Sequence, residues 1–141
     1  MIEQIFAIVS AIISLIALFL SIFSLWQSRA SIVKDFFAQG DSKEMKEYRK
    51  IIYDIYNQKM DESDILDKLK QYSVEVSHVV SFYDCWALMV KKHYLPKWAF
   101  QASSKYTAKN IYDKIKPYIE FRRETQCEYA SHFEWLIKKI Q

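Results

Sequence analysis

One apolar stretch decides the fold of this chain: residues 5–26 read IFAIVSAIISLIALFLSIFSLW. The stretch holds no charged residue and is rich in Ile, Leu, Phe and Ala. As a helix that rises about 1.5 Å per residue it would be roughly 33 Å long, which matches the hydrocarbon core of a bilayer. We therefore predict a transmembrane anchor at residues 1–28, with the span at about residues 5–26.

A cleaved signal peptide is the alternative interpretation of the same stretch. Ser28 and Ala30 form the small-x-small pattern of a cleavage site. Against this, Glu3 precedes the stretch without any Lys or Arg, and the apolar run is longer than the roughly 7 to 15 residues of a signal sequence. The anchor is therefore the preferred interpretation.

Positive charge follows the apolar stretch and does not precede it. The first basic residues after it are Arg29, Lys34, Lys43, Lys46, Arg49 and Lys50. Because Lys and Arg collect on the cytoplasmic side of single spans, we predict an external N-terminus and a cytoplasmic C-terminal domain. Trp26 and Arg29 are the predicted membrane-interface residues, since an indole suits the headgroup layer and a guanidinium reaches lipid phosphates.

Small residues recur through the anchor at alternating steps of three and four. They are Ala7, Ser10, Ser14, Ala17, Ser21, Ser24, Ser28 and Ser31. A mean step of about 3.5 is typical of the seam of a left-handed helix pair, and small or hydroxylated residues favour close packing in lipid. We predict a homo-oligomer seam. Two alternatives stay open: serines that bond back to their own helix and face lipid, or a ring of helices that lines a small pore.

The rest of the chain predicts a small all-α domain. A single glycine and two prolines argue against the turns that a β-rich fold needs. We expect a juxtamembrane helix extension at residues 29–40, ended by Gly40, and a cytosolic domain of about five helices at 41–141. Asp41 with Glu44 predicts a capping box for a helix at 42–58, and Asp61 predicts the start of a shorter helix.

The segment at residues 74–94 is the predicted central helix of the domain. Its expected apolar face comprises Val76, Val79, Val80, Tyr83, Trp86, Ala87, Val90 and Tyr94. Pro96 suits the first turn of the next helix, and Pro117 is expected to kink or restart a later one.

Three further runs carry a resemblance to a known family. They are SFYDCWALMVKKHYL at residues 81–95, IYDKIKPYIEFRRETQ at 111–126 and FEWLIKKI at 133–140. The chain resembles a family of uncharacterised bacterial proteins with one N-terminal membrane helix and a small helical cytosolic domain. The resemblance implies this architecture and a bacterial inner membrane, and it implies no catalytic residue.

Catalytic and metal-binding signatures are missing from the sequence. His78, His93 and His132 lack the spacing of metal ligands, and His93 is interpreted as a cation at a helix end. With Gly40 as the only glycine, a phosphate-binding loop and a nucleophile elbow are excluded. We therefore expect no enzyme, no cofactor and no metal. Cys85 and Cys127 are interpreted as reduced, partly buried thiols.

One basic and aromatic cluster could bind an anion. The candidate ligand face comprises Lys105, Lys109, Tyr112, Lys116, Arg122 and Arg123. A solvated surface is the simpler interpretation, because Glu120 and Glu124 lie nearby in the sequence. The net charge of +3 is weak and its charges are interspersed, so no nucleic-acid partner is expected.

These observations leave three hypotheses about function. The first is a non-enzymatic, self-associating membrane protein, whose setting is conjectured to be a membrane-acting effector in bacterial stress or phage defence. The second is a membrane-tethered sensor whose domain binds an anionic ligand such as a linear or cyclic nucleotide. The third is a scaffold that docks a cytosolic protein at the membrane.

Overall fold

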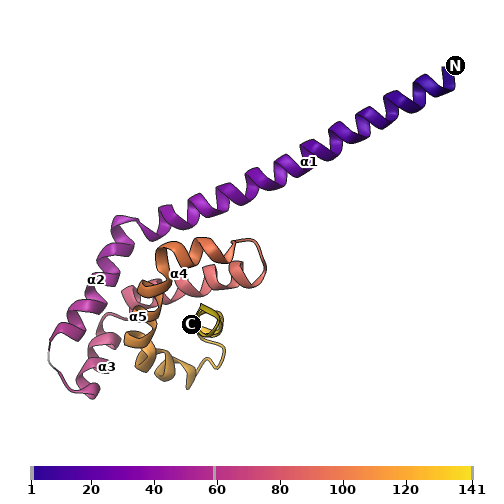
Figure 1. The fold of residues 1–141 in the computed structure, drawn as a ribbon. Coiled ribbons are helices and arrows are strands. Elements are labelled where there is room, and N and C mark those ends of the chain that lie inside the picture. Colours follow the sequence, from indigo (N-terminus) through magenta and orange to yellow (C-terminus); the bar gives the residue numbers. More distant parts are fainter. Residues whose placement is uncertain (1, 59, 141) are drawn as a thin grey trace.

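The computed structural model describes residues 2–58 and 60–140, with the backbone alone at residues 102–105. Within this described part the chain forms six helices and no strand, which confirms the all-α prediction. The helices are α1 (Ile2–Gly40), α2 (Lys43–Asn57), α3 (Glu62–Gln71), α4 (Ser73–Lys91), α5 (Lys97–Arg123) and α6 (Ser131–Ile140). Helices α2–α6 gather into one bundle, from which α1 projects (Figure 1).

Helix α1 is one unbroken helix of 39 residues, about 58 Å long at 1.5 Å per residue. The large apolar side chains of its apolar stretch are about half exposed or more, from Ile5 at 57% to Trp26 at 67%. This one segment is long and apolar enough to cross a membrane, and a signal sequence would meet the same criteria. Phe36 is the buried residue of α1.

The start of α2 differs from the predicted capping box. Helix α1 continues through Gly40, so the turn places Ser42 and not Asp41 at the N-cap of α2. The Ser42 hydroxyl accepts a hydrogen bond from the Met45 amide at 3.2 Å. Asp41 instead lies 3.6 Å from the Lys46 ammonium. The predicted Asp41–Glu44 box was therefore wrong by one residue, while the helix predicted at 42–58 is confirmed as α2.

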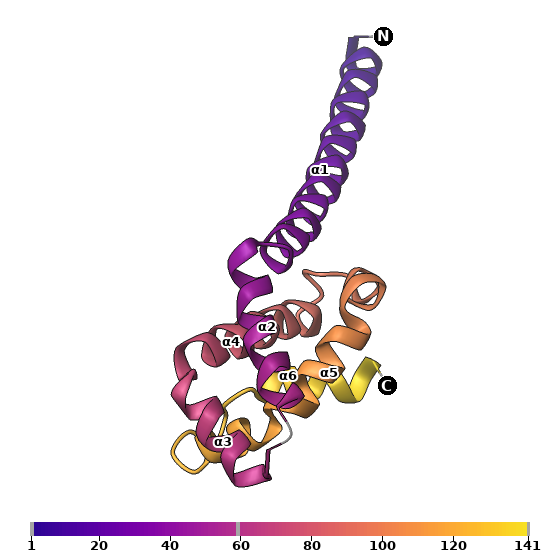
Figure 2. The ribbon, with the colours of Figure 1, turned by 90° about the vertical axis from the view of Figure 1, so that its left-hand side faces the viewer.

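Helix α4 is the centre of the bundle, as predicted. It packs most extensively against α6 and then against α2 (Figure 2). Its predicted apolar face is buried from Val76 to Val90, but Tyr94 is 58% exposed. The reason is local, because α4 ends at Lys91 and His93 adopts a left-handed backbone with φ of 62°. This turn directs the chain away from the face that the helical spacing predicted for Tyr94.

The two prolines lie at different kinds of position. Pro96 is the N-cap of α5, one residue before the predicted first turn. Pro117 lies inside α5, so it does not restart a helix there. Pro117 has no amide proton, so the carbonyl four residues before it, that of Asp113, lacks its donor within the helix. The next carbonyl, that of Lys114, accepts a hydrogen bond from the Tyr56 hydroxyl. This bond joins α5 to α2.

The N-terminus of α6 is capped by a side chain from another helix. Ala130, which precedes α6, has a φ of 58° and no side-chain acceptor. Asp84 of α4 takes over the capping role, because its carboxylate accepts a hydrogen bond from the Phe133 amide at 2.8 Å. Arg123 holds the preceding loop, since its Nε donates to the Tyr129 carbonyl at 2.9 Å.

We predict that Asp84→Ala lowers the free energy of unfolding by about 1–2 kcal/mol, because the first turn of α6 loses its acceptor. Asp84→Asn should cost less, since the amide oxygen can still accept. Unfolding of the full chain in detergent, followed by tryptophan fluorescence, measures the difference. Asp113→Ala is the control, because Asp113 only forms an exposed ion pair with Lys109 and should change stability by less than about 0.5 kcal/mol. Equal stability of Asp84→Ala and the control would contradict the assignment.

Candidate functional site

The junction between α1 and the bundle is an aromatic cluster centred on Phe36. The Phe36 ring stacks on Phe100 at 5.5 Å between centroids and on Phe82 at 6.0 Å. Trp86 meets the same ring edge-on at 5.2 Å. These partners come from α4 and α5, so one side chain of α1 contacts two helices of the bundle. Such pairs contribute about 0.5–1.5 kcal/mol each beyond the burial of apolar area.

The end of α1 is also held by the turn that follows Phe36. The Gly40 carbonyl accepts a hydrogen bond from the Arg49 guanidinium of α2 at 2.6 Å. A Cβ at position 40 would lie 3.3 Å from the Phe82 ring, so the backbone of α1 lies close to this side chain of α4. Burial raises the pKa of the nearby Tyr83 hydroxyl, and the Arg49 cation partly offsets this rise. The hydroxyl therefore stays protonated beside Arg49.

Phe36 was not among the residues singled out from the sequence. A signal was available, because Ile32, Val33, Phe36 and Phe37 follow the span at helical spacing. Ile32, Val33 and Phe37 pack at the edge of the core around Phe36. The part of α1 that packs on the bundle is therefore residues 32–37, which lie within the predicted extension at residues 29–40.

The predicted seam residues lie along the exposed part of α1, from Ala7 to Ser28. The Ser14 hydroxyl donates to the Ser10 carbonyl and the Ser21 hydroxyl donates to the Ala17 carbonyl, each at 2.9 Å. This is the bonding expected of serines that face lipid. It also leaves each hydroxyl oxygen free to accept a second hydrogen bond from a neighbouring helix.

The two predicted interface residues follow each other closely on α1. Trp26 is exposed and its ring lies 6.4 Å from that of Phe23. Arg29 lines two hollows, one between α1 and the start of α5 and a larger one that extends to α6.

The candidate anion face is not one free cationic surface among the described side chains. Lys109 pairs with Asp113 at 3.0 Å and Lys116 with Glu120 at 3.8 Å, both along α5. Lys105 lies outside the residues whose side chains are described. Lys109 and Lys116 therefore each have part of their charge balanced locally.

The remaining members of the candidate anion face make contacts within the bundle. Tyr112 is buried with its ring 5.1 Å from Phe133, and burial raises its pKa. Arg123 lies 2.8 Å from Glu134 of α6, and hydrogen bonds from Lys138 and Arg123 lower the pKa of that carboxyl. Arg122 lies over the Tyr129 ring at 5.2 Å. These contacts join α5 to α6 and the loop between them.

Comparison with known families extends over nearly the whole chain. The family described as Domain of unknown function (DUF4760) matches residues 9–140. This chain belongs to the DUF4760 family. The match confirms the resemblance to an uncharacterised family with one apolar N-terminal helix and a helical remainder. No curated protein and no solved structure matches this DUF4760 chain.

The thiols and histidines of the DUF4760 chain lie apart from one another. Both cysteines are free and exposed, so their predicted partial burial was wrong. His93 follows the end of α4, as its interpretation as a helix-end residue required. Among the described residues, no three His, Cys, Asp or Glu side chains gather as a metal site would require.

We predict that Phe36→Ala lowers the free energy of unfolding of this DUF4760 protein by about 3–4 kcal/mol, because it empties the centre of the aromatic cluster. Hydrogen exchange at residues 31–40 should rise at the same time, since the end of α1 loses its contact with α4 and α5. Phe23→Ala is the matched control, because Phe23 is 50% exposed on the same helix. Unchanged exchange at residues 31–40 in Phe36→Ala would contradict the role of Phe36.

Proposed function

We propose that this protein is a non-enzymatic single-pass membrane protein that self-associates through the Ala/Ser face of α1 and whose bundle controls the orientation of that face. One observation carries the proposal: the same unbroken helix holds the small-residue face and the buried Phe36. A change in the bundle that moves Phe36 would therefore move the face as well.

Two observations support a retained anchor over a cleaved signal sequence. Cleavage after Ala30 would cut inside the continuous helix, directly before the residues that pack on the core. The family match also begins at residue 9, so most of the apolar stretch belongs to the region that defines the family. An apolar surface of this size, exposed on every side, is stable in lipid and not in water.

The orientation rests on the distribution of charge. Basic residues start at Arg29 and none precedes the span, which supports a cytoplasmic bundle and an external N-terminus. In a bacterial cell the protein would then lie in the inner membrane.

The geometry of α1 supports pairing with a second copy. A seam repeating every seven residues drifts by about 20° per heptad on a straight helix, so two copies would cross with a left-handed twist to keep the seam closed. Lipid supplies no hydrophobic drive for helix pairing, and contacts between small residues and hydroxyls take its place. The hydroxyls of Ser14 and Ser21 retain an acceptor for this purpose.

This coupling between bundle and anchor suits a protein that acts by changing how its membrane anchors associate. The bundle would receive a cytosolic protein or ligand, and α1 would respond through its packing with other copies. The bacterial stress or phage-defence setting remains a hypothesis about where such a device is used.

We predict that single cysteines at positions 14 and 21 crosslink between copies in membranes, whereas cysteines at 15 and 22 do not. The background is Cys85→Ser with Cys127→Ser, which should be tolerated because both thiols are exposed. Crosslinked dimers on a denaturing gel give the readout. Equal yields at all four positions would contradict the seam.

A matched pair of double variants tests the same face without a thiol on the central serines. With Ser24→Cys as reporter, Ser14→Leu plus Ser21→Leu should reduce crosslinking because the larger side chains separate the helices. Leu15→Ala plus Ile22→Ala should leave the yield unchanged, because these residues lie off the seam.

A further inference from the structure

Acidic residues are absent from a long central part of the sequence. Residues 85–112 contain no Asp or Glu, whereas they contain five lysines and His93. This part covers the end of α4, the turn that follows it and the first half of α5. The segments at the α4–α5 end of the bundle therefore carry an excess of positive charge, although the net charge of the chain is only +3.

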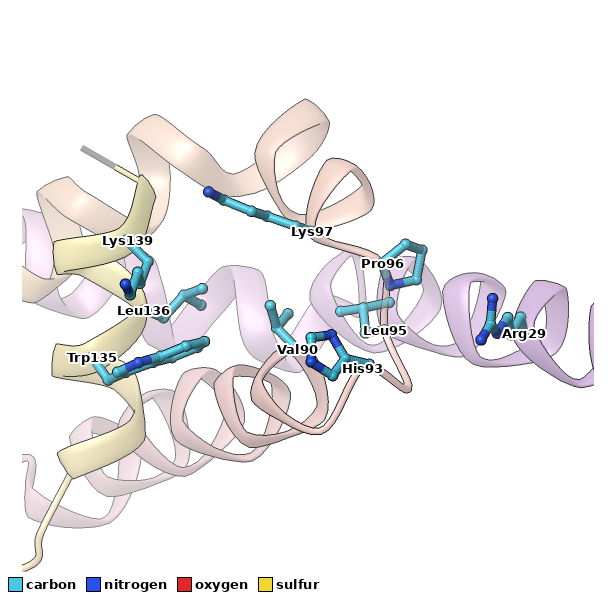
Figure 3. Close-up of a pocket in the computed structure, with 9 residues that line it drawn as sticks. All are labelled: Arg29, Val90, His93, Leu95, Pro96, Lys97, Trp135, Leu136 and Lys139. Carbon is cyan, nitrogen blue, oxygen red and sulfur yellow. The ribbon is translucent and has the colours of Figure 1, made fainter.

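A pocket of about 430 Å³ opens at this end. Four basic side chains line it, from α1, the α4–α5 turn, α5 and α6: Arg29, His93, Lys97 and Lys139. In Figure 3, Lys97 reaches over the pocket from the start of α5, and Lys139 lies opposite on α6. The apolar lining includes Leu95 and Leu136.

The charge in this pocket is not neutralised by the described residues. No carboxylate lines the pocket, and none of its basic side chains takes part in an ion pair in the described part of the chain. The N-terminus of α5 adds to the positive potential, because no side chain caps it at Pro96. The lysines farther along α5 differ, since Lys109 and Lys116 are paired with carboxylates.

His93 reaches this pocket from a strained backbone position. His93 occupies the left-handed position at the end of α4, where its amide donates to the Val90 carbonyl and the Tyr94 amide donates to the Met89 carbonyl. Glycine is favoured at this position of such a helix end, and a larger residue is strained there. The side chain that replaces it lines the pocket.

One end of the pocket lies at Arg29, just after the proposed span. A second hollow of about 370 Å³ shares Arg29 and Pro96 with it and reaches Trp26. Trp98 lines this hollow and is 61% exposed. Exposed tryptophans beside a basic site are typical of the headgroup layer of a bilayer.

We infer that this end of the bundle binds the headgroup of an anionic phospholipid, with the lipid phosphate between Lys97 and Lys139 and with Arg29 at the opposite end of the pocket (Figure 3). The inference rests on the proposal that α1 spans the membrane, because the span brings lipid to the pocket. The apolar lining and Trp98 favour a lipid over a soluble phosphate, since the glycerol and first acyl carbons can lie on them. Arg29 connects the two hollows, so the lipid contacts both the anchor and the bundle.

Native mass spectrometry of the full chain in detergent tests this site. Phosphatidylglycerol and phosphatidylcholine with identical acyl chains are the probes. We expect phosphatidylglycerol to bind at least tenfold more tightly. Lys97→Gln plus Lys139→Gln should weaken its binding by about fivefold per removed cation, whereas the control Lys109→Gln plus Lys116→Gln should stay within about twofold.

Three results would overturn the inference. The first is equal binding of the two lipids, and the second is unchanged binding by the Lys97 and Lys139 variant. The third is displacement of phosphatidylglycerol by inorganic phosphate at equal concentration, which would indicate a site for soluble anions. The intact mass in the same spectrum shows whether the apolar stretch is retained. Loss of that stretch would refute the proposed anchor, so failure of the anchor and failure of the lipid site are distinguishable.

Discussion

The insertion of Phe36 into the bundle is the contact on which the rest of the structure depends. Helix α1 has no other buried side chain among its described residues, so this ring and its neighbours connect the apolar stretch to the domain. Phe82, Trp86 and Phe100 surround the ring from two helices, and the Arg49 bond to Gly40 closes the turn behind it. An anchor joined by a flexible linker would localise the domain only. An anchor that is packed into the core also moves when the bundle changes conformation.

The sequence predicted the elements whose signals are local. The apolar stretch, the central helix and the helix that became α2 each follow from spacing within one segment. The errors in placing these elements lie at their ends, where one residue changes the outcome. Ser42 caps α2 because α1 continues further than expected, and Tyr94 is exposed because His93 takes a left-handed backbone.

The functional surfaces were harder to predict because they combine residues that are distant in the sequence. The basic cluster on α5 looked like one face, but most of its described members already have partners on the same helix or on α6. The pocket of Arg29, Lys97 and Lys139 joins three helices, and no spacing rule relates these residues. A charge count by window would have indicated only the part that His93 and Lys97 contribute, because residues 85–112 lack any acidic side chain. The same reasoning explains why Asp84 could not be recognised as the cap of α6.

The stiffness of α1 connects these surfaces to the proposed seam. The helix contains neither glycine nor proline before Gly40, so nothing in its sequence favours a hinge between Phe36 and Ser21. A rotation of the helix about its axis at Phe36 would therefore reach the seam with little loss, and a shift of one residue corresponds to about 100°. Arg29 lies between the two, so a lipid held by Arg29 and the bundle would resist that rotation. The bound lipid and the aromatic cluster would then both restrain the rotation of α1.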